Sequence, residues 1–349
     1  MKKYILVLVL LLTSLFISCS KKINAEIIQA IELGKLDKVK QLTSKNFDIN
    51  SKENGEGFTA LMAAVNANQT EVVKYLLEKD ADVDAESFGY TALSFAVQRG
   101  NEEIINLLLE KKADINSQNA MGFTPLIYAA ANKNPNIVKI LVDHGADVNH
   151  ATIDGVTPLI AAVFENQNES VLYLLNHGTD VNKKTNFGKN ALMWALFNKN
   201  QEISLLLIEK GSDINVIDEE GKNALFLAVH SRLTDIAKLL IEKGADINIQ
   251  VKSSSLSGWT VLMSSVWNTP ELVEFLINKG VALNVRNNEG ETALMQAVYA
   301  QNAKAVKLLL EKGADPKIKD KNNETAYQIA AKKQFSEIVK IFEKMSIKE

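Results

Sequence analysis

One short pattern, a glycine followed by x-T-x-L or a close variant, recurs along the chain at a nearly constant interval. Its glycines stand at Gly57, Gly89, Gly122, Gly155, Gly188, Gly221, Gly258 and Gly290, and Asn323 holds the same place at the end. The successive spacings are 32, 33, 33, 33, 33, 37, 32 and 33 residues. A period of this length is typical of repeat architectures, in which one supersecondary unit is copied and stacked.

Each copy is predicted to form two short helices. In one copy, Thr124 is a good N-cap, and Pro125 follows at the first helical position, where a missing N–H is harmless. Apolar pairs at 137–138 and 140–141 then define one face of a second helix, and Gly145 can take the left-handed conformation that ends it. Helices this short are marginal alone, so they must be stabilised by stacking on their neighbours. We therefore predict an all-α solenoid.

The opening and closing residues of each copy resemble the ankyrin repeat. The family's opening G-x-T-P-L-H-x-A is matched at 57–64, 155–162 and 290–297, and its closing G-A-D-V-N is matched at 145–149 and 244–248. The resemblance covers residues 24–345 and implies an ankyrin-repeat solenoid of about ten helix-turn-helix units. It implies an N-terminal cap repeat at 24–56, eight repeats at 57–322 and a C-terminal cap repeat at 323–345.

Two features depart from the family pattern. Asp80 and Lys112 stand where glycine normally ends the second helix. A left-handed conformation costs most other residues about 1–2 kcal/mol, so we expect these two turns to be the less favourable ones. The 37-residue step comes from extra residues within 249–257, which are expected to form a longer surface turn, either a tolerated insertion or a specific contact.

The first residues indicate export. Lys2 and Lys3 form a positive start, and residues 4–17 are apolar apart from one Thr-Ser pair. Fourteen helical residues at about 1.5 Å each are too short to cross a hydrocarbon core of about 30 Å comfortably. We interpret residues 1–18 as a signal peptide rather than a membrane span.

Cys19, the only cysteine, follows this segment directly. The segment resembles a bacterial lipoprotein signal, because the small Ser18 precedes the cysteine, although Phe16 stands where the family usually has leucine. The resemblance implies acylation of Cys19, a lipidated tether at 19–23 and attachment to a membrane through the acyl chains. It places the protein on the periplasmic side of the outer or inner membrane, or on the cell surface. An ordinary secretory signal and an uncleaved anchor remain as alternatives.

Charge and motifs argue against several functions. Removing Lys2 and Lys3 leaves 37 basic residues against 42 acidic ones, a balance of −5 that does not favour nucleic-acid binding. Nucleotide-binding, zinc-protease and serine-hydrolase motifs are absent. His144 and His177 occupy equivalent positions in adjacent repeats, about 8–10 Å apart, too far to share one metal. We expect no catalytic residue, metal, cofactor or small-molecule substrate.

The candidate binding residues come from two rows. In ankyrin repeats the turn tips and the ends of the first helices line a concave binding surface. Nine residues after each glycine stand Asn66, Gln98, Ala131, Phe164, Phe197, His230, Trp267 and Tyr299, and one residue after it stand Phe58, Tyr90, Phe123, Val156, Lys189, Lys222, Trp259 and Glu291. We expect both rows to be at least partly exposed, and aromatic residues supply many binding hot spots.

The predicted partner-binding residues are the aromatic and histidine members of these rows: Phe58, Tyr90, Phe123, Phe164, Phe197, His230, Trp259, Trp267 and Tyr299. The alternative is that these rings pack on neighbouring repeats and enlarge the core. The leading hypothesis is an exported, membrane-anchored lipoprotein that binds another protein. A narrower alternative is a dedicated inhibitor or protector of one periplasmic or surface enzyme, and a third, an enzyme in its own right, is supported by no motif.

Overall fold

The computed structural model describes residues 25–44, 47–52, 57–132, 134–253 and 256–347. The predicted signal peptide (1–18), the tether (19–23) and Cys19 lie outside these residues. The chain divides into two compact units, Met1–Ile153 and Asp154–Glu349.

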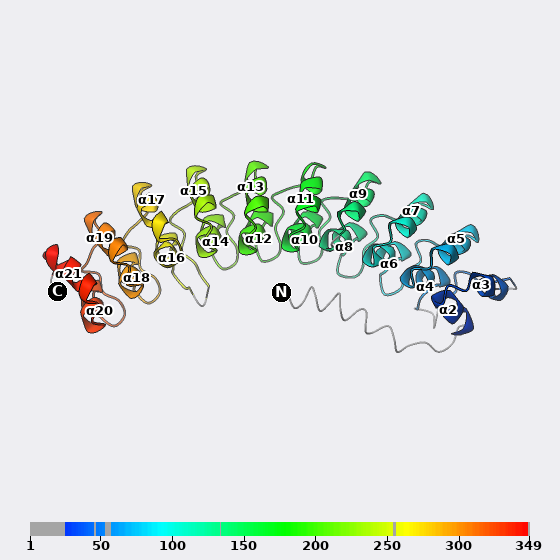
Figure 1. Cartoon of the computed structure of the whole chain (residues 1–349), viewed down its shortest axis with the longest axis horizontal. Helices are drawn as coiled ribbons and strands as arrows, with labels where there is room; N and C mark the ends of the chain where they lie inside the picture. Colours follow the sequence, from blue (N-terminus) through cyan, green and yellow to red (C-terminus); the bar gives the residue numbers. More distant parts are fainter. Residues whose placement is uncertain (1–24, 45–46, 53–56, 133, 254–255, 348–349) are drawn as a thin grey trace. The chain divides into compact units, whose positions relative to one another are not determined.

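The first unit is a stack of four helix pairs (Figure 1). The first helices α2, α4, α6 and α8 contact one another in order, and so do the second helices α3, α5, α7 and α9. The pairs are α2 (Ala25–Glu32) with α3 (Leu36–Leu42), α4 (Ala60–Asn66) with α5 (Thr70–Glu78), α6 (Ala92–Arg99) with α7 (Glu102–Glu110), and α8 (Pro125–Ala131) with α9 (Pro135–Asp143).

The second unit stacks six helix pairs in the same way. They are α10 (Pro158–Phe164) with α11 (Asn168–Leu175), α12 (Ala191–Phe197) with α13 (Gln201–Glu209), α14 (Ala224–His230) with α15 (Thr234–Glu242), α16 (Val261–Asn268) with α17 (Val273–Asn278), α18 (Ala293–Tyr299) with α19 (Ala303–Glu311), and α20 (Ala326–Lys332) with α21 (Ser336–Lys344). A short 3-10 helix, η2 (Pro270–Leu272), precedes α17. The described residues thus form ten helix pairs and no strand beyond isolated bridges, which confirms the all-α prediction.

The repeated residues hold each helix pair in place. In nine repeats a threonine or asparagine caps the first helix, its side chain accepting a backbone N–H three residues on. This cap stands two residues after the hairpin glycine, or after Asn323 in the last repeat. Asn190 and Asn223 go further, because their amide groups also donate to the carbonyls of Asp213 and Asp246 in the closing motif of the same repeat, at 3.0 and 2.9 Å. The second helices end in left-handed residues, including Asp80 (φ 57°) and Lys112 (φ 63°), as predicted.

Hairpin loops join successive pairs and bond to one another. In these bonds a backbone N–H of one hairpin donates to a carbonyl at the tip of the preceding hairpin. For example, the N–H of Lys321 donates to the carbonyl of Glu289 at 2.9 Å. The asparagine of the closing motif adds a second rung, since Asn215 accepts the N–H of Asp246 at 2.8 Å. Within each unit, successive repeats are therefore bonded on the hairpin side as well as packed through their helices.

The irregular spacings have different structural causes. In the first 32-residue step the missing residue is in the hairpin, where Phe88 and Gly89 form a two-residue turn between the paired Ser87 and Tyr90. In the second 32-residue step the missing residue lies between the two helices of the repeat, where η2 replaces the usual loop. The extra residues of the 37-residue step lengthen one hairpin, whose Val251 pairs with Trp259 while Lys252 donates to the Glu220 carbonyl at 2.7 Å.

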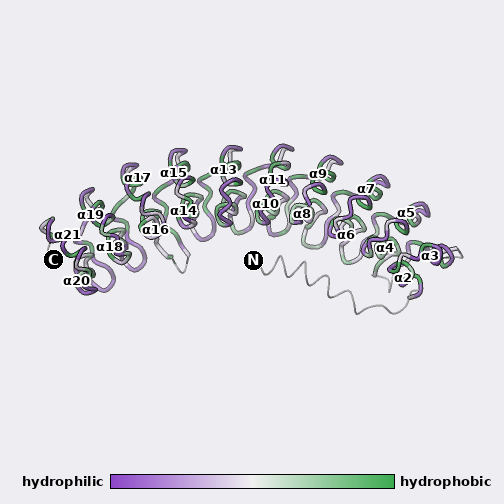
Figure 2. Tube along the Cα trace, viewed as in Figure 1, coloured by the Kyte–Doolittle hydropathy of each residue, from purple (hydrophilic) through white to green (hydrophobic). Residues whose placement is uncertain are grey.

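Hydrophobic and hydrophilic residues alternate along the helices of both units (Figure 2). The hydrophobic residues form each unit's core, with fully buried side chains such as Leu61 and Ile104 in the first and Phe226 and Phe342 in the second. Within the part of the chain that the structure describes, no helix has the length and apolar character needed to cross a membrane.

Candidate partner-binding surface

The predicted binding rows lie on what we call the hairpin-side surface: the hairpin arms and the adjoining ends of the first helices. Most of their aromatic members reach solvent. Phe197 and Trp267 are 56% and 44% exposed, and His230 is exposed too. Phe58, Phe123, Trp259 and Tyr299 are half-buried.

Tyr90 and Phe164 do not fit the expectation, because each is only 8% exposed. The rings that cover them come from a row that the sequence analysis did not consider, six residues after each glycine. Phe95 and Tyr128 lie 5.7 and 6.2 Å from Tyr90, and Trp194 lies edge-on to Phe164 at 5.4 Å. The packing alternative is therefore correct for these two residues, which support the surface from below.

In the first unit, rings from three repeats form a continuous cluster. Phe58 lies 5.0 Å from Phe95, which continues through Tyr90 and Tyr128 to Phe123, stacked on Tyr128 at 5.3 Å. Aromatic pairs at these distances are worth roughly 0.5–1.5 kcal/mol beyond their buried area. The cluster fixes the positions of Phe58 and Phe123, its two half-buried ends.

A neutral hydrogen-bond network completes the first-unit cluster. The amide of buried Asn119 donates to the hydroxyls of Tyr128 and Tyr90, at 2.9 and 3.3 Å, and its oxygen accepts the N–H groups of Met121 and Phe123. Burial, and then the hydrogen bond to Tyr90, raises the pKa of Tyr128 well above its usual range. The Tyr128 phenol therefore stays uncharged at neutral pH.

In the second unit, charged groups surround the equivalent positions. The Lys189 ammonium lies 3.2 Å from the fully buried carboxylate of Asp218 and 5.5 Å from the centre of the Trp194 ring. Trp194 also contacts Phe197, at 6.0 Å, so the exposed Phe197 stands on a fixed base. Lys222 pairs with Glu220 and lowers the pKa of that carboxyl, against the effect of partial burial.

His230 stacks on Phe226 at 6.1 Å. Desolvation first, and then the charges of Lys222 and Lys199, lower the pKa of His230, so its ring is neutral at pH 7. A neutral imidazole beside two lysines offers a partner both a donor and an acceptor.

The last aromatic members are held by polar neighbours. The indole N–H of Trp267 donates to Gln296 at 3.0 Å, and Gln296 donates to Glu291 at 2.7 Å. Partial burial, and then the carboxylates of Glu291, Asp320 and Glu324, raise the pKa of Tyr299 to about 12. Lys333 lies 5.6 Å from the Tyr299 ring. Trp267 and Tyr299 thus have fixed positions near an acidic group of side chains.

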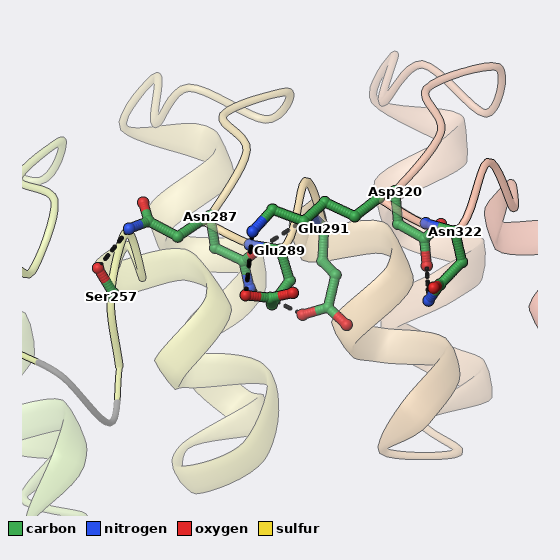
Figure 3. Close-up of polar contacts among 8 residues, drawn as sticks. Ser257, Asn287, Glu289, Glu291, Asp320 and Asn322 are labelled. Carbon is green, nitrogen blue, oxygen red and sulfur yellow. Dashed lines mark hydrogen bonds and ion pairs between the residues drawn. The ribbon is translucent and has the colours of Figure 1, made fainter.

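The structure also reveals exposed residues that the sequence analysis missed, at the hairpin tips just before each glycine. In the first unit these are Phe88, Met121 and Ile153, which are 66%, 37% and 57% exposed, and in the second unit Phe187 is also exposed. Farther along the second unit the tips are polar, with Asn288 donating to Ser257 at 2.6 Å and Lys321 paired with Glu289 at 3.4 Å (Figure 3). Counting one residue back from each glycine, rather than one forward, finds most of these positions.

Three of the four histidines bond backbone carbonyls. His144 and His177 each bond a carbonyl of their own helix through Nδ1, at 2.7 Å, and His150 bonds the Gly122 carbonyl at 2.9 Å. Among the described residues, no group of three or more His, Cys, Asp or Glu side chains could hold a metal ion.

Comparison with known proteins gives one family. The family model described as "Ankyrin repeats (3 copies)" matches residues 27–119, 113–185, 181–251 and 250–320. No curated protein matches the chain.

Proposed function

The chain belongs to the ankyrin-repeat family, and from this premise we propose that it is a non-enzymatic, membrane-anchored binding protein of the bacterial cell envelope. Ankyrin repeats indicate protein–protein interaction. The proposed binding face is the hairpin-side surface. The observation that carries the proposal is the set of aromatic side chains there that are exposed yet fixed by packing, of which Phe197 and Trp267 are the most open.

Fixed aromatic side chains suit binding because they lose little conformational freedom when a partner covers them. Phe197 rests on Trp194, and the indole of Trp267 is held by Gln296. Tyr90 and Phe164, being buried, act as supports and not as contacts in this proposal.

The test of the binding face is recovery of partners by the acylated full chain and by a Phe197→Ala/Trp267→Ala variant. A matched control is Leu172→Ala/Leu205→Ala, since these leucines are similarly exposed but lie on the second helices α11 and α13. If the proposal holds, partner affinity falls about tenfold or more in the aromatic variant and stays unchanged in the control. Equal binding by both variants would exclude these rings as the contact.

The membrane anchor is supported by the sequence alone: the short apolar segment ending at Ser18 and the single cysteine after it. We propose that Cys19 is acylated after cleavage and that the repeats face the periplasm or the cell exterior. The test is incorporation of a labelled fatty acid into the wild-type chain and into Cys19→Ala. Label in wild type alone, with Cys19→Ala released from the membrane fraction, supports the anchor, and equal membrane retention of both contradicts it. Protease treatment of intact cells then distinguishes the cell surface from the periplasm.

A further inference from the structure

The hairpin tips of the first unit are apolar where a soluble turn is normally polar. Phe88, Met121 and Ile153 are all exposed, and Asp154 is the one charged residue among the pairs that precede Gly89, Gly122 and Gly155. The tips are neighbours, because the N–H of Ile153 donates to the Met121 carbonyl at 3.1 Å, and a side chain added at Gly89 would meet Asn119 and Ala120. They form a short row of separate apolar side chains.

The fold does not explain this row. Phe88 has φ 51° in a two-residue hairpin turn, where asparagine, aspartate or glycine is preferred and a bulky side chain is unfavourable. Its ring is nevertheless the most exposed large hydrophobic side chain among the described residues. In the second unit the same position holds Phe187 in one repeat but glutamate, serine and asparagine at 220, 257 and 322, so the repeat itself requires no apolar tip. Ser257 and Asn322 are labelled in Figure 3.

The start of the repeat stack lies on the same side as these tips. In each later repeat the first helix begins three residues after the hairpin glycine, as α4 does at Ala60 after Gly57. Helix α2 packs against α4, and α3 packs against α5 in the same order, so the first residue of α2 also lies on the hairpin side. Ala25, the first described residue, therefore lies on the same side of the first unit as the row of tips.

Chain geometry limits how far the tips can be from an anchoring membrane. Only five residues lie between Cys19 and Ala25, and an extended chain of six residue steps spans at most about 20 Å. An acylated Cys19 would hold the start of α2 within that distance of the bilayer.

We infer that the first unit lies on the membrane through these tips, with Phe88, Met121 and Ile153 entering the lipid headgroup region. The inference rests on the acylation of Cys19 in the proposed function. Separate apolar side chains suit a lipid surface, because each can enter it independently, whereas a protein interface has a contiguous, closely packed core. The polar and charged tips farther along the second unit, at 220, 257, 289 and 322, do not enter lipid in this proposal.

The experiment places a fluorescent label at a tip and measures its contact with lipid. The label is attached to Ala120→Cys, an exposed residue beside Met121, or to Glu219→Cys, which holds the same hairpin position in the second unit and is also exposed. Acylation blocks the Cys19 thiol, so the new cysteine is the only reactive one. The acylated full-length proteins are bound to phosphatidylcholine vesicles whose acyl chains carry bromine, a short-range quencher.

If the inference holds, the fluorescence of the label at position 120 falls to about half, and that of the label at position 219 changes little. The variant Phe88→Ser/Met121→Ser/Ile153→Ser abolishes the quenching at position 120, while the protein stays bound through its acyl chains. Vesicle-bound protein without quenching at 120, or with equal quenching at both positions, would overturn the inference and leave the anchor intact. Failure of the wild-type protein to sediment with vesicles would instead refute the anchor, and the inference with it. Circular dichroism verifies that the triple variant is folded.

Discussion

Two equivalent contacts, one in each unit, are built from different chemistry. In the first unit the residue after a hairpin glycine, Tyr90, is joined to the residue that opens the next hairpin, Asn119, at 3.3 Å. In the second unit the same two positions hold Lys189 and Asp218, which form an ion pair at 3.2 Å. The first contact is neutral and lies among aromatic rings, whereas the second is charged.

In both units the hairpin requires one side-chain oxygen at this position. One oxygen of Asn119 accepts the N–H groups of Met121 and Phe123, and one oxygen of Asp218 accepts those of Glu220 and Lys222, all at 2.9–3.0 Å. This oxygen shapes the hairpin. The other polar atom of the side chain, the amide nitrogen of Asn119 or the second oxygen of Asp218, faces the residue that follows the preceding hairpin glycine. That second atom can change with the chemistry of the surface, so the two units can present different surfaces on one backbone.

The largest expected effect comes from Asp218→Asn. The amide keeps the oxygen that shapes the hairpin but leaves the Lys189 ammonium without its counter-charge, in a place where the lysine side chain is only 14% exposed. Breaking a buried pair from one side typically costs about 3–5 kcal/mol, and we expect about 3 kcal/mol here. Urea unfolding followed by circular dichroism measures the loss.

The control for Asp218→Asn is the double variant Lys189→Met/Asp218→Asn, which removes both charges. It should recover most of the lost stability, because a neutral pair occupies these positions naturally in the first unit. A single variant as stable as the wild type would show that the ionic contact is no more than an exposed pair.

The reverse change, Asn119→Asp, should cost about 1–3 kcal/mol at pH 8. The new carboxylate would be buried beside the hydroxyls of Tyr90 and Tyr128 and could no longer donate to them. Burial raises the pKa of such a carboxyl above its unfolded value of about 3.9, so the folded state binds the proton more tightly. Stability should therefore be nearly normal below pH 4 and fall as the pH rises through the raised pKa. Wild type is the control, and a loss that does not vary between pH 4 and 8 would contradict this account.

Much of the fold could be predicted from sequence because its determinants are local. The Thr124 cap and the left-handed turns at Asp80 and Lys112 depend on residues a few positions apart, and the structure confirms them. The glycine period also gives the number of helix pairs. Two steps of the period are 32 residues long, one residue shorter than the usual 33, and the period alone does not show where that residue is missing. A shorter hairpin at Phe88 and a shorter connection between helices at η2 give the same spacing.

The binding surface was harder to predict because exposure depends on the next repeat. Tyr90 and Phe164 belong to the predicted rows, but rings six residues after a glycine in their own or the next repeat cover them. Trp194 and Phe197 are three residues apart on α12 and share a face, a signal that could have suggested this packing. The burial of each ring depends on its neighbours in three dimensions, which a count along a single repeat does not include.

The smallest expected effect concerns Glu220 and Lys222, an ion pair at the edge of the charged surface. The hydrogen bond from Lys222 lowers the pKa of Glu220 in the folded state, so the pair stabilises the protein above the unfolded pKa of about 4.3 and this contribution is lost as the pH falls through the folded pKa. Because the Glu220 side chain is 45% exposed, solvent screening reduces the effect to a few tenths of a kcal/mol. The difference in unfolding free energy between wild type and Lys222→Met should thus be small at pH 7 and vanish near pH 3. Tyr90→Phe, which changes only the neutral contact, should show a difference that does not depend on pH over this range. A Lys222→Met difference that grew toward low pH would mean that the ion pair does not stabilise the folded state.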